Sequence, residues 1–484
     1  MKAIRFWLLT ALCAALLSGA SFARVISTVE DLVALGGTAV SEDITLQEGV
    51  YDLTGSNWRP ILSVGEGCTL DGGNAVIKGL DISRRSGSSS SGKYGFVAEN
   101  YGTITNLNVA LTSGANTGTM SAGVIAAVNN GLISNCRVFG DADAPVTITA
   151  SLCYAGGIAG SNRGTIENCS VNDISFATAG QKSFVGGIAG QMSGGFIVGC
   201  TVYNVSILIN NSADAGGIAG VIERGGSELY LSEIRECSVL YSSLSGDGGN
   251  VGGIAGSAKS VLVSKCRVNY VDLRHTGSGI CNIGGLVGEA VDLPGEQVDF
   301  SSNYYADVFS ANMHFQTGDY AGGIAGSLYA SDSTRSVFTK CFFCSDYTAV
   351  PDICGSYQGN ATADNFNECS GESKSGMTCD GWAEHALGEG WTNNGPEGYP
   401  VYSDLIPVSF ARLHRSGDYL PRSSYRLAYD GTDVAELGLV DPAAEFDPEL
   451  FAIPPFTDML PVVIEYVTVN GEMMTGPVTA GDYG

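Results

Sequence analysis

Basic residues are scarce in this chain. Its 484 residues include 24 lysines and arginines against 50 aspartates and glutamates, so the formal net charge at pH 7 is −26. A protein that binds nucleic acid needs cationic side chains to neutralise the phosphates. The composition therefore disfavours a nucleic-acid partner, and we expect anionic surfaces to repel the chain.

Histidine and the common catalytic motifs are also scarce or missing. The four histidines are His275, His314, His385 and His414, and none of them has the HExxH spacing of a zinc peptidase. The sequence has no GxSxG nucleophile motif, no P-loop and no Rossmann glycine pattern. No residue is therefore assigned as catalytic, as cofactor-binding or as a metal ligand, and no cofactor is expected.

Long apolar segments are missing beyond the N-terminus. Lys2 and Arg5 precede an apolar stretch over residues 6–17, and small residues surround Ala23. This arrangement is typical of a signal peptide, here residues 1–23, with a mature chain that starts at Arg24. No later stretch approaches the roughly 20 apolar residues of a membrane span. We expect a secreted or cell-surface protein without a transmembrane span.

Glycine is abundant, with 67 residues, about twice its usual share. Many of these glycines belong to a repeated GGIAG-like motif that recurs every 30 to 38 residues and has two weaker upstream copies. The motif starts at Gly156, Gly186, Gly216, Gly252, Gly284 and Gly322, and the weaker copies start at Tyr94 and Ala122. Repeats of this length indicate one stacked architecture rather than several independent domains.

Each repeat has a second half in which an aliphatic residue, a small apolar residue and a valine follow one another, as in Ile166, Cys169 and Val171. Short β-rich pieces between Gly and Asn turns cannot each bury a core, so the units must stack as a β-solenoid. Equivalent side chains should then form ladders along the axis. One such ladder would contain Phe96, Val124, Ile158, Ile188, Ile218, Ile254, Leu286 and Ile324.

Cysteines occupy one repeat position again and again. They are Cys136, Cys169, Cys200, Cys237 and Cys266, with Cys341 as a sixth, whereas the repeat at Gly284 has Tyr304 near that position. We interpret them as a ladder of buried thiols that pack as small hydrophobic groups. Cys153 and Cys281 share another phase, three residues before a glycine pair.

Four further cysteines lie outside the repeat: Cys344, Cys354, Cys369 and Cys379. In an exported chain they predict two disulfides, of three possible connectivities, that close the C-terminal end of the solenoid. Zinc is the alternative for this region, because Cys341 and Cys344 have the spacing of a zinc pair. No second CxxC pair follows, and the ladder already uses Cys341.

The motifs GGIAG and GTIENC followed by valine resemble the GLUG-motif repeat of bacterial exported and surface proteins, over about residues 30–405. The resemblance implies a right-handed parallel β-helix with an N-terminal capping segment at 24–92, repeats at 93–350 and a C-terminal cap at 351–410. Some proteins with these repeats are IgA-directed metallopeptidases, whose activity resides in a separate zinc domain. This sequence lacks the HExxH motif of such a domain.

The sequence changes character after Pro400, where the glycine pairs end and short alternating segments begin. Residues 424–484 resemble the YDG-type or MBG-type immunoglobulin-like modules of bacterial surface proteins. The resemblance implies a small β-sandwich module over 411–484, and such a module would have another strand after Gly484.

The function expected from the sequence is non-enzymatic adhesion or ligand binding by a surface β-solenoid, with an extracellular protein or glycan as partner. The alternative is a carbohydrate-active β-helix enzyme, a polysaccharide lyase or hydrolase with a groove of carboxylates on one face. Candidate acids for that groove are Asp141, Asp143, Asp214, Asp247 and Asp319. We favour solvated turn acids as the interpretation of these residues. The sequence predicts neither the ligand nor the oligomeric state.

Overall fold

The computed structural model divides the chain into two compact units, Met1–Asp404 and Leu405–Gly484. In the first unit the structure describes residues 23–83, 92–117, 120–141, 146–150, 153–178, 183–223, 232–294, 298–306, 313–346, 350, 352–393 and 399–402. In the second unit it describes four short strands, β48 (Leu413–Arg415), β49 (Asp418–Leu420), β50 (Tyr466–Val467) and β51 (Met473–Met474). The predicted signal peptide lies outside the described residues apart from Ala23.

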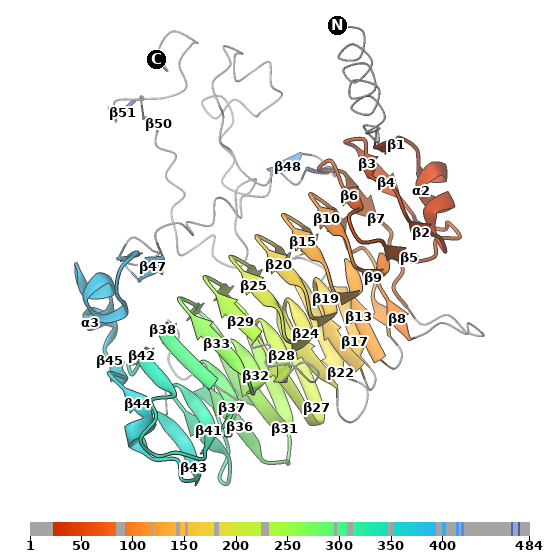
Figure 1. Cartoon of the computed structure of the whole chain (residues 1–484). Helices are drawn as coiled ribbons and strands as arrows, with labels where there is room; N and C mark the ends of the chain where they lie inside the picture. Colours follow the sequence, from red (N-terminus) through yellow and green to blue (C-terminus); the bar gives the residue numbers. More distant parts are fainter. Residues whose placement is uncertain are drawn as a thin grey trace, which may run out of the picture. The chain divides into compact units, whose positions relative to one another are not determined.

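The first unit is a parallel β-helix, as the repeat predicts. Three sheets of 21, 13 and 11 strands run along it, and every strand pair within them is parallel. Successive turns of the chain follow one another in sequence order, as the colour bands of Figure 1 show. Among the described residues, no helix is both long enough and apolar enough to cross a membrane.

Sheet A has 21 strands and receives two short strands from most turns of the chain. Its strands are β1 (Arg24–Ile26), β3 (Ile44–Leu46), β4 (Val50–Asp52), β6 (Thr69–Asp71), β7 (Val76–Lys78), β10 (Thr103–Thr105), β11 (Asn108–Ala110), β15 (Leu132–Ser134), β16 (Arg137–Phe139), β20 (Thr165–Glu167), β21 (Ser170–Asn172), β25 (Phe196–Val198), β26 (Thr201–Tyr203), β29 (Ser232–Arg235), β30 (Ser238–Leu240), β33 (Val261–Ser264), β34 (Arg267–Asn269), β38 (Val298–Ala306), β42 (Phe338–Cys344), β44 (Phe366–Asn367) and β45 (Ser370–Glu372).

Sheet C lies before the glycine pairs and sheet B after them. Sheet B contains β2 (Ala39–Val40), β5 (Ile61–Val64), β9 (Val97–Asn100), β14 (Ala126–Asn129), β19 (Ala159–Asn162), β24 (Ala189–Ser193), β28 (Ala219–Glu223), β32 (Ala255–Ala258), β37 (Val287–Asp292), β41 (Ala325–Ala330) and β43 (Cys354–Gly359). Sheet C contains β8 (Lys93–Tyr94), β12 (Ala115–Asn116), β13 (Met120–Gly123), β17 (Val146–Ala150), β18 (Cys153–Gly156), β22 (Ile174–Thr178), β23 (Phe184–Gly186), β27 (Ser206–Gly216), β31 (Ser243–Gly252), β35 (Asp272–His275), β36 (Cys281–Gly284), β39 (Met313–His314) and β40 (Tyr320–Gly322). The sheet C strands that end at Gly156, Gly186, Gly216, Gly252, Gly284 and Gly322 are each followed by the glycine-pair turn into sheet B.

The glycine pairs are required by close backbone packing rather than by an unusual backbone conformation. A Cβ atom on Gly217 would overlap the carbonyl oxygen of Gly253 and lie 2.7 Å from a methyl group of Val239. On the sheet B side, a Cβ on Gly256 would lie 2.9 Å from the Cβ of Asp214. Gly217 therefore has no room for a side chain because of the next turn and sheet A, and Gly256 has none because sheet B lies directly against sheet C.

The interior contains the predicted aliphatic ladder. All eight of its side chains are fully buried, with Ile218 at 0% exposure. The backbone N–H of Ile188 donates to Ile218 O at 3.0 Å, and that of Ile218 donates to Ile254 O at 2.9 Å. Each turn thus satisfies the backbone of the next while its side chain packs on the equivalent side chain.

Asparagine has two roles at the corners. Asn135 and Asn168 precede ladder cysteines and adopt a left-handed conformation with φ of 52°, which asparagine tolerates better than most residues. A second set is buried and stacked: Asn100 Nδ2 donates to Asn129 Oδ1, and Asn129 Nδ2 donates to Asn162 Oδ1, each at 2.8 Å. Each amide thus donates to the next side chain in the interior, where an unpaired amide is costly, and among the described residues Asn100 Oδ1 at the N-terminal end of this stack has no partner.

The predicted thiol ladder is confirmed, with two changes. The cysteines at the repeat position are buried thiols, and Cys136 N–H donates to Cys169 Sγ at 3.4 Å. Asn303, rather than Tyr304, takes the cysteine position after Cys266, whose N–H donates to Asn303 Oδ1 at 2.8 Å. Cys369 joins the ladder beyond Cys341, because Cys341 N–H donates to Cys369 Sγ at 3.4 Å.

The prediction of two disulfides at the C-terminal end is wrong. All four cysteines are thiols, and they lie in different surroundings. Cys354 pairs in register with Ala325 in sheet B, while Cys369 belongs to the thiol ladder. Cys344 is buried in a separate cluster, where Tyr399 Oη donates to its sulfur at 3.8 Å, and Cys379 is exposed.

The predicted boundaries also change. Parallel pairing continues past residue 350, since β43, β44 and β45 add to β41 and β42. The following segment contains α3 (Lys374–Met377), η2 (Ala383–Leu387) and the antiparallel pair β46 (Trp391–Thr392) and β47 (Val401–Tyr402).

That segment packs on the outward face of sheet A. It forms a second hydrophobic cluster there in which Trp391 meets Tyr304 at a ring distance of 5.7 Å. At the other end of the unit, α2 (Val29–Leu35) is capped by the Thr28 side chain and buries Leu32 and Leu35. The short 3-10 helix η1 (Ala363–Asn365) precedes β44.

The second unit starts at Leu405, inside the predicted cap at 351–410. Its described strands form two antiparallel pairs, β48 with β49 and β50 with β51. The rest of the immunoglobulin-like module expected at 411–484 lies outside the described residues, so that assignment stays a prediction.

The substitution Ile218→Asp should destabilise the β-helix by several kcal/mol, because it buries an unpaired carboxylate between two turns. Thermal and urea unfolding followed by circular dichroism would measure this. Leu208→Asp is the matched control, since Leu208 lies on the preceding strand with 39% exposure. An unchanged transition in Ile218→Asp would contradict the inward position of this residue.

Alkylation should distinguish the thiols by burial alone. Without denaturant, Cys379 should react readily, because its side chain is exposed. Burial raises the pKa of Cys169 and Cys237 well above the usual value, so these ladder thiols should react only after denaturation. Peptide mapping by mass spectrometry would show it. If Cys344 or Cys354 needed a reductant as well, the thiol assignment would be wrong.

Candidate functional site

Two ladders of side chains on the outside of the β-helix face each other across the glycine-pair turn. We call these residues the polar strip. In sheet C they are Lys93, Ser121, Tyr154, Phe184, Asp214, Asn250, Asn282 and Tyr320. In sheet B they are Glu99, Val128, Ser161, Gln191, Val221, Ser257, Glu289 and Ser327. Strand alternation explains their direction, since Ala213 and Ala215 on either side of Asp214 belong to the core.

The centre of the polar strip is a network of acids and amides. Asp214 Oδ1 accepts from the backbone N–H of Asn250 at 3.2 Å, and Asn250 Nδ2 donates to Glu289 Oε2 at 3.4 Å. Ser257 Oγ donates to the same Glu289 oxygen at 3.3 Å, and Asn282 Nδ2 donates to Asn250 Oδ1 at 2.7 Å. Asn250 therefore bridges two carboxyl groups on facing ladders.

Asp214 has unusual acid–base behaviour within this network. Burial, and secondly the nearby charge of Glu289, raise its pKa to about 7. The hydrogen bonds from Asn250 act in the opposite direction but are outweighed. The Asp214 carboxyl group therefore exchanges its proton near neutral pH, next to a second carboxyl group.

Aromatic and amide groups lie further toward the N-terminus of the strip. The rings of Tyr154 and Phe184 are stacked, with centroids 5.4 Å apart. Gln191 Nε2 donates to Glu223 Oε2 at 3.1 Å, and Ser161 Oγ donates to Gln191 Oε1 at 3.3 Å. The strip thus combines ring faces, which stack on apolar surfaces, with amides and carboxyls that pair with hydroxyl groups.

The acids proposed from the sequence do not meet on one face. Asp214 lies in the polar strip, whereas Asp319 is buried on the inward side and the side chain is 1% exposed. Asp247 holds the next turn by accepting from the N–H groups of residues 278 and 279 at 2.6 and 3.2 Å. Asp141 follows β16, and Asp143 lies outside the described residues. The four of these acids that the structure describes therefore do not line a common groove.

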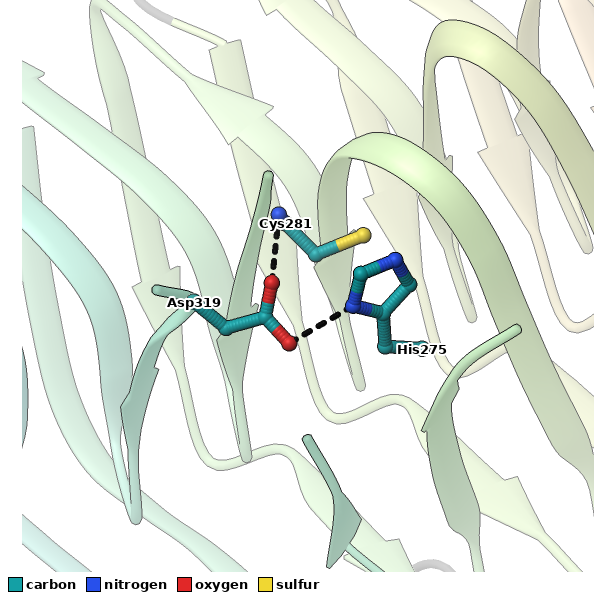
Figure 2. Close-up of side chains that lie close together, drawn as sticks. All are labelled: His275, Cys281 and Asp319. Atoms are coloured by element: carbon teal, nitrogen blue, oxygen red, sulfur yellow. Dashed lines mark hydrogen bonds and ion pairs between the residues drawn. The ribbon is translucent and has the colours of Figure 1, made fainter. Parts of the chain in front are cut away.

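Asp319 instead meets two residues that the sequence did not assign to any site. One ring nitrogen of His275, Cys281 Sγ and one carboxylate oxygen of Asp319 lie within 4.8 Å of one another. Figure 2 shows the three side chains close together. The sequence did contain a sign that Cys281 and Asp319 lie together, because each lies three residues before a glycine pair and the two pairs belong to adjacent turns. The position of His275 could not be inferred in this way, because it lies before the loop that joins β35 to β36 and has no fixed distance from a glycine pair.

The zinc pair considered for Cys341 and Cys344 is not supported by their positions. Cys341 lies in the main hydrophobic core, whereas Cys344 lies in the cluster on the outward face of sheet A. Residues three apart on a strand point to opposite faces, which accounts for the separation.

Comparison with known proteins adds little to this geometry. No protein-family model matches the sequence, and no curated protein matches it significantly. Among solved structures, a "putative immunoglobulin A1 protease" from Bacteroides ovatus is similar over 79% of this chain and 93% of that chain, at 18% sequence identity and a TM-score of 0.38. The fold is therefore assigned from the strand pairing of this chain, and the resemblance to GLUG-motif proteins stays a prediction.

The variant Asp214→Asn should become more stable than the parent protein as pH rises. The folded-state pKa of Asp214, about 7, exceeds the unfolded value, so its contribution is fully present below about pH 4 and is lost as pH rises through 7. Asparagine does not ionise, so the stability difference should grow across this window, by at most about 4 kcal/mol. Thermal unfolding of both proteins from pH 4 to 8 measures it.

Asp332→Asn is the control for this experiment. Hydrogen bonds from the backbone N–H and then from the hydroxyl group of Thr334 lower the pKa of Asp332. This shift has the opposite sign to the raised pKa of Asp214. The Asp332 carboxylate stabilises the folded state above the unfolded pKa, so the variant should gain nothing between pH 4 and 7. A pH-independent difference for Asp214→Asn would contradict the position of that carboxyl group.

Proposed function

We propose that the chain is an exported, non-enzymatic β-helix that binds an extracellular ligand along the polar strip, and that this binding serves adhesion. The observation that carries the proposal is the strip itself: aromatic rings, amides and carboxyls aligned over successive turns on one outward face. A repeat scaffold suits such a role because its ladders present equivalent positions at the regular spacing of neighbouring strands, about 4.8 Å.

The chemistry of the strip favours a neutral glycan as the ligand. Sugar hydroxyls both donate and accept hydrogen bonds, as the half-buried amides of Asn250 and Asn282 do. The C–H face of a sugar ring can stack on Tyr154 or Phe184. A net charge of −26 opposes binding of a polyanion, so acidic polysaccharides should bind more weakly than neutral ones.

A second candidate function is cleavage of a polysaccharide. The observation in its favour is the pair of carboxyl groups at Asp214 and Glu289. One has a pKa of about 7, raised by burial and by the charge of the other, so it holds a proton that it can donate. Glycosidases use such a pair, a protonated acid and an ionised carboxylate. The burial of Asp214, at 8% exposure, argues against its direct contact with a substrate.

Screening a panel of neutral and acidic polysaccharides with the purified chain tests both candidates. Binding is measured by affinity electrophoresis, and bond cleavage by release of reducing ends. We expect binding of a neutral polysaccharide without cleavage, weakened about tenfold in Phe184→Ala because one stacking surface is lost. Phe196→Ala is the matched control, since Phe196 is 46% exposed on sheet A.

Two outcomes would contradict the binding proposal. Cleavage that disappears in Asp214→Asn and Glu289→Gln would establish the second candidate in its place. Equal loss of binding in Phe184→Ala and Phe196→Ala would remove the strip as the binding surface.

A further inference from the structure

A cluster of three chemically reactive side chains lies inside sheet C, on two consecutive turns. His275 ends β35, Cys281 begins β36 after a short loop, and Asp319 precedes β40 on the following turn. Cys281 and Asp319 occupy equivalent positions, because Asn282 pairs in register with Tyr320. The cluster lies on the side of the sheet opposite to the polar strip and is separate from it.

Asp319 holds the cluster together. Its Oδ2 accepts from His275 Nδ1 at 2.7 Å and from the backbone N–H of Gln316 at 2.6 Å. Its Oδ1 accepts from the backbone N–H of Cys281 at 3.0 Å. The carboxylate therefore fixes the imidazole orientation and, with Nδ1 acting as donor, leaves Nε2 as a lone-pair acceptor.

His275 Nε2 is buried and has no hydrogen-bond partner among the described residues. The residue is 8% exposed and its side chain 2% exposed. In Figure 2 this nitrogen lies on the side of the ring that faces the sulfur of Cys281. A buried nitrogen lone pair without a partner is costly, and a cation would satisfy it.

The sulfur of Cys281 is held in place by backbone contacts. Gly248 donates its backbone N–H to Cys281 Sγ at 3.1 Å. Burial first, and then the charges of Asp319 and Asp247, raise the pKa of this thiol to about 12, so the free site holds a thiol whose proton a bound metal ion would displace. Cys281 Sγ donates to Gly246 O at 3.6 Å, and once the thiol has lost its proton this carbonyl oxygen is available as a metal ligand. Asp247, between these glycines, fixes the loop before Cys281 through the backbone N–H groups of residues 278 and 279. The surrounding backbone is therefore arranged around the sulfur.

We propose that this cluster binds one zinc-like transition-metal ion, with His275 Nε2 and Cys281 Sγ as direct donors and Asp319 as the positioning residue. The charges agree with this assignment, since a divalent ion is neutralised by one thiolate and one carboxylate. Imidazole and thiolate select zinc and similar ions over magnesium or calcium, which prefer oxygen. Gly246 O and a water would complete the four ligands of a tetrahedral site.

A cysteine, a histidine and an aspartate could also form a catalytic triad with a nucleophilic thiol. The burial of Cys281 argues against that interpretation. Cys281 is 0% exposed, so no substrate reaches its sulfur in this structure. A nucleophilic cysteine is partly exposed and reactive. A structural metal ion needs no access for a substrate, and it would tie the loops at 276–280 and 315–319 to the preceding turn.

The test is metal binding by the purified full chain after treatment with a chelator. Titration with zinc against a chromophoric competitor should give one tight equivalent per chain, and cobalt should give a thiolate-to-cobalt charge-transfer band. Cys281→Ser and His275→Gln should abolish both signals. Asp319→Asn should weaken zinc binding about 10–100-fold, because it perturbs the orientation of the imidazole. Zinc should also raise the unfolding temperature of the parent protein.

Two thiol variants serve as controls. Cys266→Ser removes a buried ladder thiol whose sulfur contacts backbone carbonyls, and Cys379→Ser removes the exposed thiol. Both should retain the zinc equivalent. Circular dichroism without metal shows whether each variant folds, and if Cys281→Ser and His275→Gln do not fold, the cobalt spectrum of the parent protein decides.

Several results would overturn the proposal. They are the lack of a stoichiometric zinc equivalent in the parent protein, the lack of a thiolate–cobalt band, and zinc binding that persists in both Cys281→Ser and His275→Gln. Rapid alkylation of Cys281 in the native protein, suppressed in His275→Gln, would indicate an activated nucleophile instead.

Discussion

Close contact between the backbones of sheets B and C is the constraint on which the rest of the structure depends. At each glycine pair the chain turns from one sheet into the other with no room for a side chain, as the contacts of Gly216 with Ala219 and Ala255 of sheet B show. That turn fixes the phase of every residue that follows it. Because the turns then stack in register, one residue type at one phase becomes a ladder, whether of isoleucine, asparagine or cysteine.

Repeat phase is also what the sequence could predict best. It predicted the parallel β-helix, the buried aliphatic ladder around Ile218 and the ladder of thiols, because each of these recurs at a constant distance from a glycine pair. It failed where the turns change length. Asn303 was missed as the substitute for cysteine, since the insertion before it obscures the register.

The prediction of two C-terminal disulfides was wrong for a related reason, because the repeat register could not be recognised in that part of the sequence. Cys344, Cys354 and Cys369 have no regular spacing in the sequence. In the structure Cys354 belongs to sheet B, and Cys369 lies between two strands of sheet A, so both are part of a further turn of the β-helix. Cys344 points the other way and packs with Tyr399. A disulfide framework is a sound inference for small exported domains with little core. Here the stacked turns already supply the core, so no covalent closure is needed.

The candidate sites lie where side-chain identity changes within a regular backbone. In the polar strip the backbone register is unbroken from Phe184 through Asp214 to Asn250, and only the chemistry of the side chains varies. At the buried cluster the backbone itself changes: β27 and β31 each run as one strand with a β-bulge between Asn210 and Ala213, whereas the turns on either side break into two strands, β22 with β23 before them and β35 with β36 and β39 with β40 after them. The break lets His275 and Asp319 face inward beside Cys281. Such a break would expose loop ends to fraying, so a bound ion at this place would restore the continuity that the strands lose.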